Sequence, residues 1–145
     1  MELTNATMAD AEFLFAIRND PVTRAMSRGE APIDWQAHVQ WLARMIDDSN
    51  CALYVARAPA PVGSGRIDKR DGGAELSWTI APAQRGKRLG TELLAQLIQR
   101  APAGALVAHI KSDNAPSLAL AARHQFAKRA AADGLETWVR IKPAA

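Results

Sequence analysis

Hydrophobic and polar positions follow two different periods along this chain. Residues 75–80 alternate strictly, with apolar side chains at the even positions and polar ones at the odd positions, which is typical of a strand with one buried face. Residues 87–101 carry leucine and isoleucine at intervals of three and four, which is typical of an amphipathic helix. Blocks of both kinds occur from end to end, so the pattern predicts a chain with helices and strands.

Capping residues mark where the helices begin. Asp34 and Asn114 are good N-caps, and Thr7 with Asp10 has the spacing of a capping box. Pro21 prevents the first helix from continuing unbroken, because proline lacks an amide proton and disfavours the helical conformation at the residue before it. We therefore predict helices over residues 9–19, 35–47, 87–101 and 114–124.

The remaining apolar segments are short and are separated by turn-forming residues, which is the pattern of strands. Residues 58–61 and 71–73 are interpreted as turns, so we expect one domain over residues 1–145. The predicted order is β-α-α-β-β-β-α-β-α-β-β, an α/β chain whose mixed sheet is covered by helices. The predicted strands are residues 2–7, 52–57, 62–69, 75–80, 105–111, 126–131 and 136–142.

Composition narrows the class of protein. Apolar residues make up 48% and charged residues 23% of the chain, which is ordinary globular usage. The net charge of +3 is too small to indicate nucleic-acid binding, and no nucleic-acid recognition motif is present. No apolar run reaches membrane-spanning length and the N-terminus has no signal-peptide pattern. We therefore expect a cytoplasmic protein without nucleic-acid or membrane partners.

Cysteine and histidine usage predicts neither a disulfide nor a metal site. Cys51 is the single cysteine, so we expect a buried, reduced thiol. The three histidines are far apart in the sequence and no cysteine pair accompanies them, so no metal-ligand spacing is present.

The most informative segment for chemistry joins the strand at 75–80 to the helix at 87–101. Its loop holds two glycines and three cations. The first amides of a helix have no partners within the helix, and the helix dipole makes that end partly positive. This arrangement suits a pyrophosphate group. A solvated basic turn is the alternative, since neither a Walker A loop nor a dinucleotide fingerprint is present.

This loop resembles motif A of the GNAT superfamily of N-acetyltransferases, Q/R-x-x-G-x-G/A. Arg85 occupies its first position and Gly90 its last, whereas Arg88 replaces the central glycine and either crowds the loop or adds a phosphate contact. The resemblance implies the GNAT-like acyl-CoA N-acyltransferase fold, with loop amides on the pyrophosphate of acetyl-CoA or CoA and the strand end on the pantetheine arm. The cofactor-binding residues it implies are Trp78, Ile80, Arg85, Gly86, Lys87, Arg88, Leu89, Gly90, Thr91, Asn114 and Ser117.

A later segment is similar to a second motif of that superfamily, N-x-x-[AS]-x-x-x-Y-x-x-x-G-F. Asn114, Ser117 and Phe126 match it at the same spacing, and Asn114 can act as a helix cap at the same time. Ala121 stands where the family has tyrosine, and Gln125 where it has glycine. The tyrosine is the family's general acid for the leaving thiolate, so Ser117 or water would have to replace it.

The front half is similar to a subgroup, the nucleotide-aminosugar N-acetyltransferases of the pseudaminic acid pathway. A looser likeness exists to the N-terminal acetyltransferases of ribosomal proteins. The tryptophans of this half are expected to be core residues. The residues that carry the likeness are Arg18, Asn19, Asp20, Pro21, Arg24, Met26, Ile33, His38 and Trp41.

An N-acetyltransferase needs a base, because an aliphatic amine is mostly protonated at neutral pH. Glu75 is the first candidate, since many family members carry a carboxylate on this strand; its alternative is a surface glutamate. His38 is the second, from the subgroup likeness, and a structural histidine is its alternative. His109 faces either the core or the cleft. The catalytic candidates are Glu75, His38 and Ser117.

Three hypotheses follow for the function. The first is acetyl transfer from acetyl-CoA to a small primary amine, for example a nucleotide-linked aminosugar. The second is acetylation of protein N-termini or lysines. The third, which Ala121 and Arg88 motivate, is an acyl-CoA-binding module without catalysis. The pattern leaves the oligomeric state open between monomer and homodimer.

Overall fold

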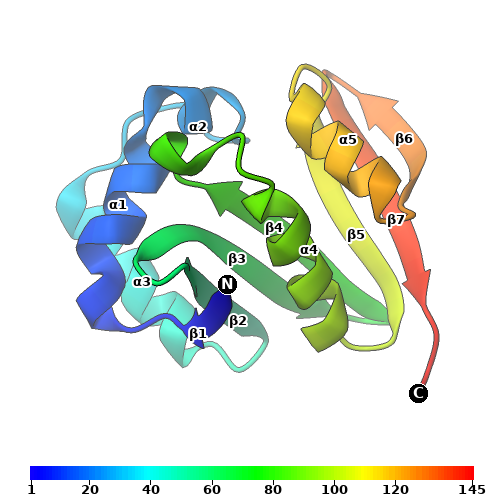
Figure 1. The fold of residues 1–145 in the computed structure, drawn as a ribbon, viewed down its shortest axis with the longest axis horizontal. Coiled ribbons are helices and arrows are strands. Elements are labelled where there is room, and N and C mark those ends of the chain that lie inside the picture. Colours follow the sequence, from blue (N-terminus) through cyan, green and yellow to red (C-terminus); the bar gives the residue numbers. More distant parts are fainter.

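A computed structural model describes residues 1–145 and contains one seven-stranded sheet with the strand order β1-β2-β3-β4-β5-β7-β6 (Figure 1). All neighbouring strands are antiparallel except β4 and β5, which are parallel. The elements are β1 (Glu2–Asn5), the short 3-10 helix η1 (Met8–Asp10), α1 (Ala11–Asn19), α2 (Pro21–Ala25), α3 (Trp35–Asp47), β2 (Cys51–Arg57), β3 (Pro61–Arg70), β4 (Gly73–Ile80), η2 (Pro82–Gln84), α4 (Leu89–Arg100), β5 (Gly104–Lys111), α5 (Ala115–Arg123), β6 (Ala127–Ala132) and β7 (Leu135–Lys142).

The predicted fold class and order of elements are confirmed, with one additional helix. α2 was not predicted, because Pro21 was interpreted only as a break. Asp20 is extended and its side chain accepts a hydrogen bond from the amide of Thr23, so Pro21 occupies the first turn of a new helix, where proline is tolerated. The helix predicted over residues 87–101 begins at Leu89, because Arg88 is in the left-handed conformation.

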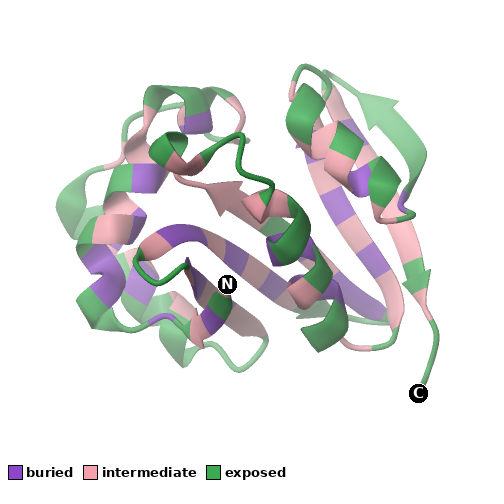
Figure 2. Ribbon diagram, in the orientation of Figure 1, coloured by how far each residue is buried: buried purple, intermediate pink, exposed green.

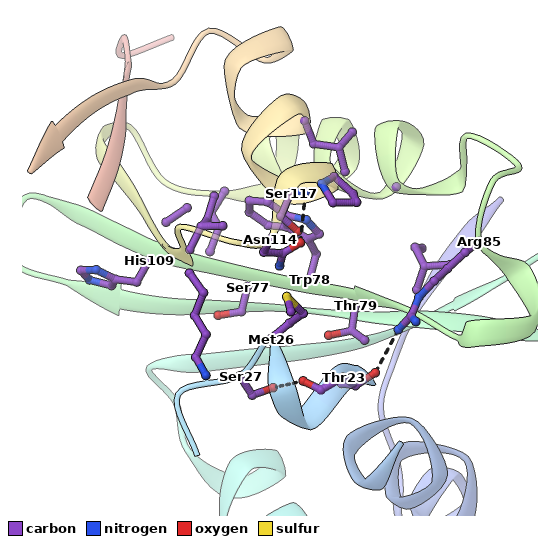
Figure 3. A pocket seen from close by; sticks show the side chains of 18 of the residues that line it. Thr23, Met26, Ser27, Ser77, Trp78, Thr79, Arg85, His109, Asn114 and Ser117 are labelled. Atoms are coloured by element: carbon purple, nitrogen blue, oxygen red, sulfur yellow. Dashed lines mark hydrogen bonds between the residues drawn. The ribbon is translucent and has the colours of Figure 1, made fainter. Parts of the chain in front are cut away.

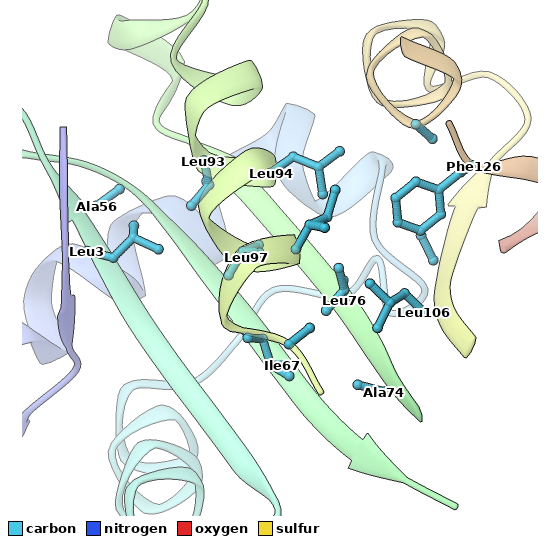
Figure 4. Packing of buried hydrophobic residues seen from close by; sticks show 14 of the residues in the cluster. Leu3, Ala56, Ile67, Ala74, Leu76, Leu93, Leu94, Leu97, Leu106 and Phe126 are labelled. Atoms are coloured by element: carbon cyan, nitrogen blue, oxygen red, sulfur yellow. The ribbon is translucent and has the colours of Figure 1, made fainter. Parts of the chain in front are cut away.

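Each face of the sheet has its own hydrophobic core. α4 packs against one face, where its leucines contact β3, β4 and β5, and α5 adds Ala121 to the same cluster of 16 buried residues (Figure 4). α1 and α3 cover the other face over β2 and part of β3, where Leu14 and Leu42 pack with Val55. This separation follows from the alternation of side chains along each strand.

The strands β4 and β5 separate soon after they begin. Only three residue pairs join them, Gly73–Glu75 with Ala105–Val107. Beyond that point β4 stays paired with β3 as far as Ile80, and β5 stays paired with β7 as far as Lys111. One edge of β4 therefore has no neighbouring strand between Leu76 and Ile80.

The face that α1 and α3 leave uncovered is polar. Cross-strand partners share a face of a sheet, and the register places Ser64, Arg66 and Asp68 of β3 opposite Thr79, Ser77 and Glu75 of β4. On β5, the residues that alternate with buried Leu106, Ala108 and Ile110 lie on this same side. We call this surface the polar face; its residues are Ser64, Arg66, Asp68, Glu75, Ser77, Thr79, His109 and Lys111.

The edge strand β6 adds no side chain to either core. All six of its residues are exposed (Figure 2), and it pairs only with β7. No helix of the chain is both long enough and apolar enough to cross a membrane.

Candidate active site

A cleft of about 990 Å³ lies where β4 and β5 separate. Its walls come from α2, β3, β4, the loop before α4, β5 and α5. Figure 3 shows side chains of α2, β4, the loop, β5 and α5 around it. That volume is at the upper end of what small-molecule sites in proteins occupy. The cleft joins the polar face to the N-terminus of α4, so a single ligand can contact both.

The loop before α4 presents free backbone amides to this cleft. Gly86 has φ of +81° and Arg88 has φ of 62°, so the chain turns tightly at both positions. The amides of Gly86, Lys87 and Arg88 have no backbone acceptor. The first amides of α4 also lack partners within the helix, which makes this end a binding site for anionic groups.

The cofactor-binding residues predicted from the sequence lie together at this cleft, with one exception. Trp78, Ile80, Asn114, Ser117 and the loop residues line it. Lys87 is the exception, and its ammonium group lies 3.1 Å from the side-chain oxygen of Gln84, a residue at the edge of the cleft. Its contact with the cofactor stays a prediction, and its backbone amide is one of the free amides of the loop.

The Arg85 side chain holds the loop against α2. Its Nη2 donates to Oγ1 of Thr23 at 3.0 Å and lies 3.9 Å from the Asp20 carboxylate (Figure 3). The amide of Thr23, followed by its hydroxyl and Arg85, lowers the pKa of Asp20. Arg85 therefore fixes the position of the loop as well as adding positive charge to the cleft.

The second predicted motif lies on α5 at the opposite wall. The Asn114 side chain caps this helix by accepting from the amide of Ser117 at 3.4 Å, and both residues line the cleft (Figure 3). Ala121 is fully buried in the core and does not line the cleft. Ser117 therefore brings a hydroxyl group to this wall of the cleft.

Trp78 leaves a polar atom without a partner at the cleft wall. Its indole Nε1 is buried and donates no hydrogen bond within the chain, although an unpartnered buried donor costs free energy. An acceptor atom on a bound ligand would satisfy it. This donor, together with the free amides of the loop, fits the polar arm and phosphates of an acyl-CoA.

Glu75 lies where β4 and β5 begin to separate, and it is in an ion cluster. Its carboxylate oxygens are 2.6 Å from Nη2 of Arg70, 3.2 Å from Nη2 of Arg28 and 3.8 Å from Nε2 of His109. The side chain is 12% exposed and lines the cleft. Glu75 therefore lies at the cleft as part of an ion cluster with two exposed arginines, and its role as base stays a prediction.

His109 faces the cleft and not the core, which resolves the alternatives left by the sequence. Its Nδ1 is 3.2 Å from Oγ1 of Thr137 on β7, and its Nε2 points toward Glu75. Thr137 lies directly opposite His109 in the sheet register, so the orientation of the ring is set by two neighbouring strands.

His38 is fully buried between α1 and α3 and does not reach the cleft. Its Nε2 donates to the carbonyl of Ala11 at 2.8 Å, and its Nδ1 accepts from Nη1 of Arg18 at 2.8 Å. Burial, more than the Arg18 charge, lowers its pKa. The catalytic role expected for His38 is corrected to a structural one, because neither ring nitrogen is free.

Cys51 is not a nucleophile of this site. Burial, followed by the Asp68 carboxylate, raises the pKa of its thiol to about 11, whereas a reactive cysteine needs a lowered pKa. It lies on β2, outside the cleft. No group of three or more potential ligands is arranged to hold a metal ion.

Comparison with known proteins identifies the family of the chain. The model of the acetyltransferase (GNAT) domain family matches residues 1–127. The chain belongs to the GNAT acetyltransferase family. It is therefore an acetyl-CoA-dependent acyltransferase, and the family predicted from the sequence is confirmed. No protein of the curated collection matches the chain.

Solved structures of GNAT proteins resemble the chain over nearly its whole length. A ribosomal-protein-alanine N-acetyltransferase from Brucella melitensis is 28% identical, with a TM-score of 0.78 over 97% of this chain and 99% of that one. The protein yncA of Salmonella typhimurium, solved with acetyl-CoA, is 25% identical, with a TM-score of 0.80 over 100% and 96%. A spermidine N-acetyltransferase from Vibrio cholerae shares the fold, with a TM-score of 0.84 over 97% and 95% at 14% identity.

Several cleft residues of this GNAT domain were missed by the sequence analysis. Arg28 and Arg66 line the cleft, and Thr137 orients His109. The alternation of polar residues at 64, 66 and 68, facing the same alternation at 75, 77 and 79 across the predicted turn, is the signal that could have found the polar face. Arg28 lies in a segment without a periodic pattern and gave no such signal.

Proposed function

We propose that this protein transfers the acetyl group of acetyl-CoA to the primary amine of a small molecule, for which a nucleotide-linked aminosugar remains one candidate. The observation that carries the proposal is the continuity of the cleft, which joins the free amides before α4 to the polar face. Bound acetyl-CoA supplies the thioester whose C–S bond breaks as the new C–N bond forms. An acceptor amine held over the polar face meets that thioester from the side opposite the loop.

The loop and the two diverging strands would hold the acyl donor. The amides of Gly86 to Gly90 and the guanidinium of Arg88 suit the phosphates. The unpaired edge of β4 offers backbone groups to the amide-containing arm, in the manner of an added strand. Positioning of this kind supplies much of the rate enhancement for acyl transfer.

Glu75, supported by His109, is the proposed base for the amine proton. Arg70 and Arg28 each donate one hydrogen bond to its carboxylate, which has about four acceptor sites, so lone pairs remain for the amine. Glu75 would take the proton, directly or through one water, because the two nitrogens of His109 already face Thr137 and Glu75. Ser117 would return a proton to the leaving sulfur. The Glu75→Gln and His109→Gln variants should each lower kcat at neutral pH while binding acetyl-CoA normally.

Calorimetric titration with acetyl-CoA, followed by a thiol-release assay over a panel of amines, tests the proposal. The matched variants are Gly90→Val and Gly29→Val. A Cβ at Gly90 meets Leu120 at 2.9 Å inside the cleft, whereas nothing lies within 4 Å of one at Gly29. We expect binding and transfer to be lost only in the first variant. Binding without turnover on any amine would overturn the proposal and leave an acyl-CoA-binding module.

Acetylation of protein N-termini is the second candidate, and the 28% identity to a ribosomal-protein-alanine N-acetyltransferase favours it. The two functions differ in the acceptor. If this second function is correct, the α-amine of a peptide will be acetylated faster than any free small amine. Peptides whose first residue is alanine or serine therefore belong in the same assay.

A further inference from the structure

A second, smaller cavity lies beside the cleft, between α1, α3 and the polar face. Its volume is about 140 Å³. Arg66, Ser77, Trp78 and Thr79 line both cavities, so the smaller one opens from the acceptor side of the cleft. Such a space holds one small chemical group, whereas whole ligands occupy several hundred Å³.

Arg18 brings an uncompensated charge to this cavity. It forms no ion pair; its only hydrogen bond runs from Nη1 to Nδ1 of the neutral His38, at 2.8 Å. Its guanidinium lies over the Trp41 ring, 3.7 Å from the centroid. Burial, followed by the charge of Arg66, lowers the pKa of Arg18. His38 and Trp41 therefore fix a cation in place without neutralising it.

Arg66 faces the same space from β3. Its Nε donates to Asp68 at 2.7 Å, and its two terminal nitrogens have no partner within the chain. Two guanidinium groups thus border the cavity, and the one carboxylate beside them, that of Asp68, pairs with Arg66 alone. Half-buried cations that repel each other cost free energy in the absence of an anion, and such arrangements mark functional sites.

We propose that Arg18 and Arg66 bind a carboxylate of the acceptor, so that the amine substrate is a free amino acid or a close analogue. This inference rests on the proposed acetyl transfer. The planar fork of arginine matches a carboxylate with two parallel hydrogen bonds, and the hydroxyls of Ser64, Ser77 and Thr79 can add further donors. The amine of the same molecule then extends into the cleft beside Glu75 and His109. A polyamine would place a second cation against the two arginines.

The kinetic test compares each of the common L-amino acids with its own carboxamide, and with spermidine. Loss of a charge-assisted contact lowers kcat/KM by about 10- to 100-fold, so we expect acids to exceed their amides by that factor. In Arg66→Gln this preference should disappear while the affinity for acetyl-CoA stays unchanged. Arg129→Gln, which removes the same charge from the exposed strand β6, should retain the preference.

Equilibrium binding gives a readout that does not need turnover. In the presence of CoA, N-acetyl-L-amino acids should bind more tightly than their amides, and Arg66→Gln should abolish the difference. Acid binding without acetyl transfer would overturn the proposed function and support the carboxylate site. Transfer at equal rates to acids and amides, a preference for spermidine, or the absence of any acid binding would overturn the carboxylate site.

Discussion

At the scale of single residues, His38 couples packing to pH. Both of its nitrogens are engaged in the neutral form, and a further proton would face the Arg18 guanidinium. Its pKa is lowered from the ordinary value of 6.5. Below that value the unfolded chain binds a proton that the folded chain does not, so the folded state loses stability.

We therefore expect the free energy of unfolding to fall as the pH is lowered from about 7.5 to 5.5, by up to about 1.4 kcal/mol per pH unit below 6.5. Urea unfolding at several pH values measures this slope. His38→Gln should flatten it, whereas His124→Gln should not. The pKa values of Asp20 and Glu136 are also lowered, from 3.8 and 4.5. The stability that these two carboxylates contribute to the folded protein is lost only at more acidic pH, outside this window. An unchanged slope in His38→Gln would show that His38 does not cause the pH dependence of stability.

Arg88 carries backbone strain that the family's usual glycine would not. Its φ of 62° is left-handed, which costs an L-residue about 1–2 kcal/mol. We expect Arg88→Gly to be more stable than Arg88→Ala by about 1 kcal/mol in chemical unfolding. Both variants should bind CoA more weakly than the parent chain if the guanidinium contacts phosphate. Tighter binding in Arg88→Gly would mean instead that the arginine crowds the loop.

Single-residue roles were predictable where a local rule decides them. Asn114 was expected to cap a helix, and it does, because capping depends on residues three positions apart. The place of His38 was not predictable, since the packing of α3 against α1 decides it.

At the scale of elements, the short parallel junction of β4 and β5 depends on close backbone approach. A Cβ at Gly73 would lie 1.9 Å from the carbonyl oxygen of Ala105, and backbone cannot yield as a flexible side chain does. Gly73→Ala should therefore destabilise the protein by about 1–3 kcal/mol and reduce acetyl-CoA binding. Thermal unfolding followed by circular dichroism measures the first effect. Gly29→Ala, at an open position, is the control. Equal melting temperatures for the two variants would show that the close approach at Gly73 does not limit stability.

The order of elements was predictable because each has a strong period or a clear cap. The way the strands pair in the sheet was harder to predict. Nothing local in residues 75–80 or 105–111 indicates that these strands pair over three residues and then separate; the glycines packed at the junction and the core on each side decide that. The loop before α4 could be picked out as a candidate anion site from its charge and glycines, whereas the second cavity depends on residues from five separate elements.

At the scale of the whole molecule, the cleft divides the sheet into a larger part and a smaller part joined by that junction and by α4. A ligand bound across the cleft contacts both parts. Saturation at 100 times Kd adds about 2.7 kcal/mol to the free energy of unfolding, so acetyl-CoA should raise Tm by about 5–10 °C for a chain of this size. Differential scanning fluorimetry with acetyl-CoA measures the shift, and Gly90→Val should abolish it. No shift in the parent chain at saturating ligand would contradict this view of the cleft.

The exposure of β6 has an evolutionary consequence. All six of its side chains are exposed, and apart from the ion pair of Lys128 with Glu136 the strand contributes through its backbone pairing to β7. Selection on such a strand acts on its ability to stay extended and soluble, and only weakly on which side chains it carries. Among descendants of a common ancestor, residues 127–132 should drift faster than any other strand, while insertions that break the pairing with β7 should be rare.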